Sequence, residues 1–86
     1  MNNLENLDES ERFVYEWQFG MLGGFKRSLI ETIGRADGCN LDLLRLGFPD
    51  EVLGYENYTR IDGWWQNVKI KAGKWLTSNM NFTLQI

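Results

Sequence analysis

Carboxylate side chains are the only groups in this sequence whose spacing could support acid–base chemistry. Three sets stand close together in the chain: Asp8 with Glu9, Asp50 with Glu51, and Glu56 with Asp62. Paired carboxylates hydrolyse glycosidic bonds in many enzymes, one as the acid and the other as base or nucleophile. Neighbouring acids at a helix start, however, are usually solvated partners of the helix dipole. We therefore predict no catalytic residue and no enzymatic activity.

Other catalytic and metal-binding arrangements lack the residues they need. The 86 residues include no histidine and a single cysteine, Cys39. Ser-His-Asp and Cys-His nucleophiles require an imidazole, and zinc and copper sites draw mainly on histidine and cysteine. The sequence also has no GxxxxGK[ST] phosphate loop and no acidic calcium-binding loop. We predict neither a metal site nor a cofactor.

The aromatic residues favour a binding role. Aromatic side chains make up 14% of the chain, including four tryptophans, and a domain of this size has little interior in which to bury them. Trp64 and Trp65 are adjacent, so on a helix their side chains point about 100° apart, which predicts one in the core and one at the surface. Tryptophan and tyrosine dominate protein interfaces. The predicted partner-binding residues are Trp64, Trp65, Tyr58, Asp50, Glu51 and Glu56.

Nucleic-acid binding is the alternative hypothesis. The net charge of −3 is unevenly distributed: the first 16 residues carry five acids and one base, whereas residues 61–86 carry three lysines and one acid. Lys69, Lys71 and Lys74, together with Trp75, resemble a surface that combines stacking with positive charge. So few lysines neutralise few phosphates, and the same pattern is typical of a polar helix face whose lysine stems cover core tryptophans. We prefer the interpretation as a polar helix face over nucleic-acid binding.

Length and composition predict one domain over residues 1–86. Hydrophobic residues make up 43% and charged residues 24%, both typical of a folded globular chain. The first residues are polar and acidic, unlike a signal peptide, and no apolar run approaches the roughly 20 residues of a membrane helix. We expect a flexible end over residues 1–8, a helical body over 9–73 and an extended tail over 74–86.

The helical body is predicted to begin with one long helix over about residues 9–35, either straight or bent near the glycines, with a kink at Gly23-Gly24 as one option. Asp8 and Glu11 have the spacing of a capping box. Apolar residues then recur every four positions and form one slowly winding stripe: Phe13, Trp17, Met21, Phe25, Leu29 and Ile33. Residues 13–19 also alternate in polarity, which suits a strand, but the stripe favours the helix.

Small residues form a second line on this predicted helix. Gly20, Gly24 and Ser28 are also spaced by four, and such a line lets a neighbour approach closely. The preferred interpretation is an internal groove for a tryptophan of the same chain. The alternative is a contact between two copies through Gly20 and Gly24, joined by Phe82 and Leu84 of the tail.

Three shorter helices complete the predicted fold. They cover residues 41–47 with Asn40 as N-cap, 49–60 with Pro49 in the first turn, and 64–73 after the turn at Asp62-Gly63. Residues 80–86 alternate between apolar and polar side chains, which is typical of a strand. The predicted fold is an all-α bundle of about four helices with an extended or β-strand tail. An α+β fold with a small sheet of both termini is the alternative.

Residues 13–72 resemble small helical proteins encoded by bacteriophages and prophages. The resemblance rests on Gly-Phe-Pro-Asp-Glu-Val at 47–52, Gly63-Trp64-Trp65, Tyr15-Glu16-Trp17-Gln18-Phe19 and Gly23-Gly24-Phe25; the tail departs from it. These motifs specify a fold more than an activity. The resemblance implies a small effector in the bacterial cytoplasm that binds a bacterial protein. By analogy with anti-CRISPR proteins, we expect an inhibitor of a defence nuclease.

Overall fold

The computed structural model describes the backbone of residues 4–80 and the side chains of residues 4–73. A short 3-10 helix, η1 (Leu4–Asn6), precedes five α-helices: α1 (Glu9–Gln18), α2 (Gly24–Arg35), α3 (Gly38–Gly47), α4 (Pro49–Arg60) and α5 (Trp64–Met80). Between residues 4 and 80 there is no strand. The prediction of an all-α fold is confirmed, with five α-helices rather than four.

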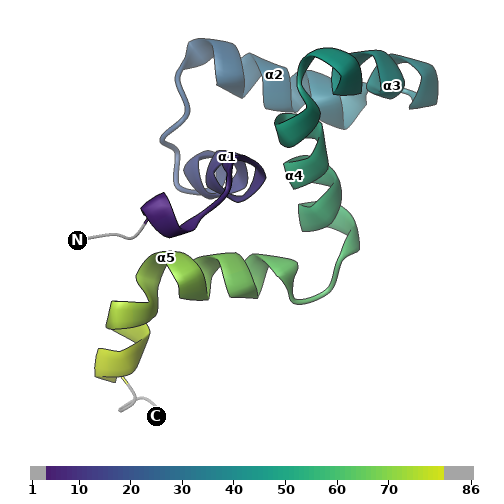
Figure 1. Ribbon diagram of the computed structural model, residues 1–86. Coiled ribbons are helices and arrows are strands. Elements are labelled where there is room, and N and C mark those ends of the chain that lie inside the picture. The colour runs from purple at the N-terminus through teal and green to yellow at the C-terminus, as the bar shows by residue number, and fades with distance from the viewer. Residues whose placement is uncertain (1–3, 81–86) are drawn as a thin grey trace.

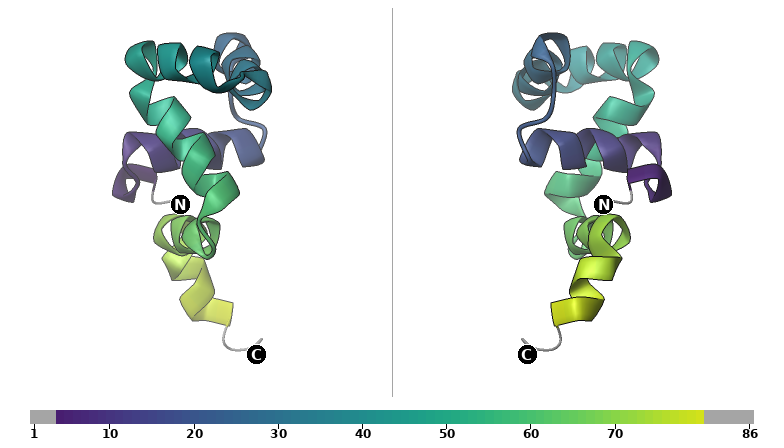
Figure 2. Two further views of the ribbon diagram at one scale, coloured as in Figure 1. Left: turned by 90° about the vertical axis from the view of Figure 1, so that its right-hand side faces the viewer. Right: turned by 90° about the vertical axis from the view of Figure 1, so that its left-hand side faces the viewer.

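The helices form tiers joined by α4. In Figures 1 and 2, α2 and α3 make one end of the molecule, α5 makes the other, and α1 crosses α4 between them. The molecule is elongated, with extents of 47 × 25 × 18 Å. Three clusters of buried side chains accompany these tiers: Leu7 with Val68 and Ala72, Phe13 with Leu22 and Ile30, and Leu29 with Ile33 and Val52. The first cluster joins the start of the chain to α5, the second joins α1 to α2, and the third joins α2 to α4.

The predicted helix over 9–35 is wrong because the chain turns at Gly20. This glycine has a φ of +69°, a backbone conformation that costs glycine no steric penalty. The N–H of Gly20 donates to the Trp17 carbonyl at 3.2 Å, and the N–H of Met21 donates to the Glu16 carbonyl at 2.7 Å. These two bonds are the Schellman motif that ends helices. Residues 9–18 are helical, so the strand alternative for 13–19 is also wrong.

Helix starts agree with the sequence at two positions and differ at a third. The Asp8–Glu11 capping box is confirmed, and Pro49 begins α4. The helix predicted over 41–47 begins three residues earlier, because the Asp37 carboxylate accepts from the N–H of Asn40 at 2.9 Å and is therefore the N-cap. Asn40 lies inside α3 instead of capping it.

Both ends of the described chain contain helix where the sequence predicts a flexible end and an extended tail. Leu7 is buried against Val68 and Ala72, which gives residues 4–7 a packed position. Helix α5 continues to Met80 with non-helical angles at Gly73, so the tail expected from residue 74 is helical as far as residue 80. Of the strand predicted for residues 80–86, only Met80 is described, and it is the last residue of α5. The remaining positions lie outside the described residues.

Helix α4 approaches the backbone of α1 closely at Gly54. A Cβ atom placed on Gly54 would lie 2.5 Å from the carbonyl oxygen of Ser10 and 3.1 Å from Cγ2 of Val14. Only a residue without a side chain fits there.

None of the described helices is long and apolar enough to cross a membrane.

Candidate protein-binding surface

Six aromatic side chains form a chain of ring contacts that we call the aromatic cluster. Its members are Tyr15 and Trp17 of α1, Phe19 directly after α1, Tyr55 and Tyr58 of α4, and Trp65 of α5. Tyr58 is central, with its ring centroid 5.1 Å from Trp17 and 5.8 Å from Trp65, both in edge-to-face geometry. Aromatic pairs prefer this geometry, so the rings hold one another in defined positions.

The cluster opens to solvent where α1 ends and α5 begins. Phe19 is 55% exposed, and its ring lies 4.6 Å from Tyr15 and 6.2 Å from Trp65 between centroids. Tyr58 and Trp65 are half-buried. The Lys69 ammonium lies 5.6 Å from the Trp65 ring centroid, within the range of a cation–π interaction. The outer part of the cluster is therefore an aromatic surface with a positive charge at its edge.

Trp64 and Trp65 do not divide into one core and one surface residue. Both are half-buried, and both pack against the buried cluster of Leu7, Val68 and Ala72. Trp65 alone makes ring contacts with Phe19 and other members of the aromatic cluster. Which of the two tryptophans contacts the cluster depends on where α1 packs against α5. The helical spacing within α5 does not reveal this position.

The three predicted acidic contacts lie away from the aromatic surface. Asp50 is exposed in the first turn of α4. Glu51 lines a polar hollow of about 240 Å³ together with Glu9, Arg12, Glu16 and Lys26. Glu56 is bound to Arg45 of α3 at 2.6 Å and lies 3.8 Å from Arg60. Of the six predicted partner-binding residues, the structure brings together only Tyr58 and Trp65, with Trp64 beside them.

The ion pair between Glu56 and Arg45 joins α3 to α4. The hydrogen bond from Arg45 lowers the pKa of Glu56; burial acts in the opposite direction but is outweighed. A carboxylate whose pKa is lowered on folding stabilises the folded state above its ordinary pKa, 4.5 here, and that stability is lost as the pH falls through the lowered value.

We expect Glu56→Gln to lower the free energy of unfolding at pH 7 by about 1 kcal/mol. The loss should shrink below pH 4.5, where protonation of the wild-type carboxylate removes the same pair. Urea unfolding at several pH values measures both effects. A loss that is equal at pH 3 and pH 7 would contradict the assigned role of the charge. Glu31→Gln, at an exposed acid of α2 that forms no ion pair with another described residue, is the control.

The residues of the nucleic-acid hypothesis are engaged within the chain where the structure describes them. Lys71 pairs with Glu11 at 2.5 Å, and Lys69 lies over Trp65. The side chains of Lys74 and Trp75 lie outside the described residues. Both described lysines thus already interact with another residue of the same chain.

The predicted glycine line does not form a helical face. Gly20 lies in the turn after α1, and Gly24 is the first residue of α2, so the two are on different elements. A Cβ at either position would meet no atom within 4 Å, so neither marks a close packing contact. The predicted contacts Phe82 and Leu84 lie outside the described residues. The close approach predicted for a glycine occurs instead at Gly54.

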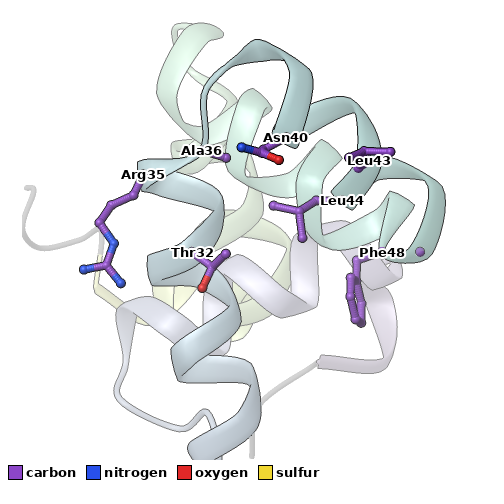
Figure 3. A pocket seen from close by; sticks show the side chains of 8 residues that line it. Thr32, Arg35, Ala36, Asn40, Leu43, Leu44 and Phe48 are labelled. Carbon is purple, nitrogen blue, oxygen red and sulfur yellow. The ribbon is translucent and has the colours of Figure 1, made fainter.

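Sequence reasoning missed a groove between α2 and α3. It encloses about 410 Å³ and is lined by Thr32, Arg35 and Ala36 on one side and by Asn40, Leu43, Leu44, Gly47 and Phe48 on the other; Figure 3 shows its labelled side chains around the space between the two helices. Leu43 and Leu46 are 65% and 82% exposed. A signal was present, because four leucines at 41, 43, 44 and 46 cannot all face one side of a helix.

The described residues contain no group of three or more histidine, cysteine, aspartate or glutamate side chains that could hold a metal ion. Cys39 is exposed on α3.

Comparison with protein-family models, with curated protein sequences and with solved structures finds no match to this chain. The functional proposal therefore depends on the surfaces just described.

Proposed function

We propose that this chain is a non-enzymatic protein-binding module that binds its partner through the outer part of the aromatic cluster. The supporting observation is that the Trp65 ring of α5 contacts both Phe19, directly after α1, and Tyr58 of α4. Phe19 is more than half exposed. Large aromatic side chains contribute most to the free energy of many protein interfaces.

The rings are held in place before a partner binds. Each ring of the surface contacts at least one other ring within 6.4 Å between centroids. A side chain that is already fixed loses less conformational entropy on binding than a mobile one. Because the rings are already fixed, we expect a partner to recognise the existing shape of this surface without rearrangement of its side chains.

The specific form of the proposal follows from the resemblance to phage proteins. A bacterial protein is the expected partner, and inhibition of a defence nuclease such as a CRISPR-Cas nuclease is the expected effect. This part rests on analogy with anti-CRISPR effectors. Bacterial lysate is accordingly the first source in which to search for the partner.

Affinity capture with quantitative mass spectrometry tests the proposal. We expect the wild-type chain to enrich a defined bacterial protein, and the double substitution Phe19→Ala/Trp65→Ala to reduce its recovery at least about tenfold, because truncation of two hot-spot residues commonly costs more than 1.4 kcal/mol. Ile70→Ala, at a 50% exposed residue of α5, should leave recovery unchanged.

Two controls make the capture result decisive. Circular dichroism must show that the double variant keeps its helices, and purified partner must bind wild-type chain directly in calorimetry. Equal capture by the wild type and the double variant would contradict the proposal. Recovery of nucleic acid with a steep salt dependence would instead favour the lysine hypothesis.

A further inference from the structure

We propose that the groove between α2 and α3 binds a second copy of this chain, in a two-fold dimer where Leu46 of each copy fills the groove of the other. The groove is open and largely apolar, and the two helices that line it, α2 and α3, form the end of the molecule away from α5 (Figure 1). This inference is independent of the proposed aromatic surface.

The shape of the groove suits a helix. Its two walls are consecutive helices, and much of its lining is small: Thr32 and Ala36 on the α2 side and Gly47 on the α3 side. Small side chains let a third helix approach the backbone closely. Larger apolar residues, Leu43 and Phe48, line the α3 side. A helix that lies along this groove would cover Leu43, which is 65% exposed.

Leu46 supplies the protruding side chain that such a groove needs. It is 82% exposed, it does not line the groove, and it lies between Leu43 and Gly47, which do. The same helix thus presents a hollow and an apolar projection side by side. A two-fold interface uses one surface patch twice, so the patch must complement itself. A patch that carries both features meets that requirement.

Charges at the two ends of α3 indicate the relative direction of the two copies. Arg35 lines the groove near the start of α3, and Asp50 follows the end of α3 in the first turn of α4. Both are exposed, and neither forms an ion pair with any other residue that the structure describes. When two α3 helices lie antiparallel, Arg35 of each copy is at the end where the other copy has Asp50. Two intermolecular ion pairs would then form.

A second copy fits this patch better than an unrelated helix because the patch contains its own complement in shape and in charge. The chain has an overall net charge of −3, which two copies tolerate at physiological salt because charges beyond roughly 8 Å are largely screened.

Sedimentation velocity of the full chain over a range of concentrations tests the dimer. We expect the wild type to move from monomer to dimer as its concentration rises. Leu46→Lys should raise the dissociation constant at least tenfold, because a lysine would be buried in a largely apolar groove that is also lined by the positive charge of Arg35. Ile70→Lys, at a 50% exposed apolar position on α5, should have no effect. Leu46 is mostly exposed, so its substitution leaves the fold intact, as circular dichroism will verify.

Two results would overturn the dimer. One is a wild-type chain that stays monomeric up to about 1 mM, a concentration at which even weak specific complexes form. The other is self-association that Leu46→Lys leaves unchanged, since that dimer would use another surface. Phe19→Ala/Trp65→Ala should still dimerise, so failure of the protein-binding proposal and failure of the dimer are separate outcomes.

Charge reversal tests the antiparallel direction. Arg35→Glu and Asp50→Arg should each weaken dimerisation, because each places like charges together. The double variant Arg35→Glu/Asp50→Arg should recover most of the wild-type affinity, since it exchanges the two signs. Single variants that dimerise like the wild type, or a double variant weaker than both singles, would overturn the antiparallel arrangement.

Discussion

Replacing Gly54 with alanine is expected to lower the free energy of unfolding by about 2–3 kcal/mol. An added Cβ would lie 2.5 Å from the Ser10 carbonyl oxygen, a backbone atom of α1 that cannot rotate away. The helices would have to separate, and Val14, which is fully buried at this crossing, would lose contacts. The intrinsic preference of alanine for helices, up to about 1 kcal/mol, is too small to compensate.

Thermal and urea unfolding measure this effect, with Gly24→Ala as the matched control. A Cβ at Gly24 meets nothing within 4 Å, so that variant should be as stable as the wild type or slightly more stable. For a domain of this size a loss of 2–3 kcal/mol corresponds to a fall in melting temperature of roughly 10 °C or more. Equal stability of Gly54→Ala and Gly24→Ala would show that α1 and α4 do not cross at this point.

The second large effect is expected for Glu11→Ala, at about 2 kcal/mol. The Glu11 side chain accepts from the N–H of Asp8 at 3.0 Å, and in return the Asp8 carboxylate accepts from the N–H of Glu11 at 2.8 Å. Glu11 is 8% exposed and also pairs with Lys71 of α5. One side chain therefore caps α1 and holds it against α5.

Asp8 belongs to the same network. Burial raises the pKa of its carboxylate, but the hydrogen bonds from Glu11 and Ser10 and the positive charge of Lys71 outweigh burial, so the pKa is lowered. Stability from Asp8 is present above its ordinary pKa of 3.8 and is lost as the pH falls through the lowered value. Glu11→Ala removes a residue of this network without touching Asp8 itself.

Two further variants separate the roles of Glu11. Glu11→Gln retains an acceptor for the Asp8 N–H but loses the charge that Lys71 pairs with, so it should cost less than Glu11→Ala. Glu16→Ala removes an exposed pair with Arg12 on the same helix, and surface pairs of this kind contribute about 0.5 kcal/mol or less. A loss for Glu16→Ala as large as that for Glu11→Ala would contradict the assigned role.

The candidate site was only partly predictable from sequence. Tyr58 and Trp65 were identified because aromatic side chains exceed what a small interior holds, and they do lie in contact. Phe19 was assigned to no surface, because its exposure follows from the turn at Gly20. Glu56 was assigned to a partner, whereas its contact is Arg45, eleven residues away in the same chain. The charge of a residue does not show whether it binds a partner protein or pairs with another helix of the same chain.

Local signals were sufficient for the helical class and for several helix ends. Asp8 with Glu11 and Pro49 act within one turn of the backbone, so their effect is contained in the sequence around them. Gly20 is also a local signal, but a glycine in a line of small residues is compatible with both packing and termination. Only the positive φ and the two Schellman hydrogen bonds show that Gly20 ends a helix and does not pack against a neighbour.

The tertiary structure decided which residues meet. The crossing at Gly54, the joining of Phe19 to Trp65 and the exposure of Leu46 all depend on how helices far apart in sequence pack together. Helical periodicity defines the faces of one helix, but the identity of the helix that covers each face depends on the volume and shape of all the others. For this chain, residue patterns determined the elements, and packing between elements determined the surfaces available for binding.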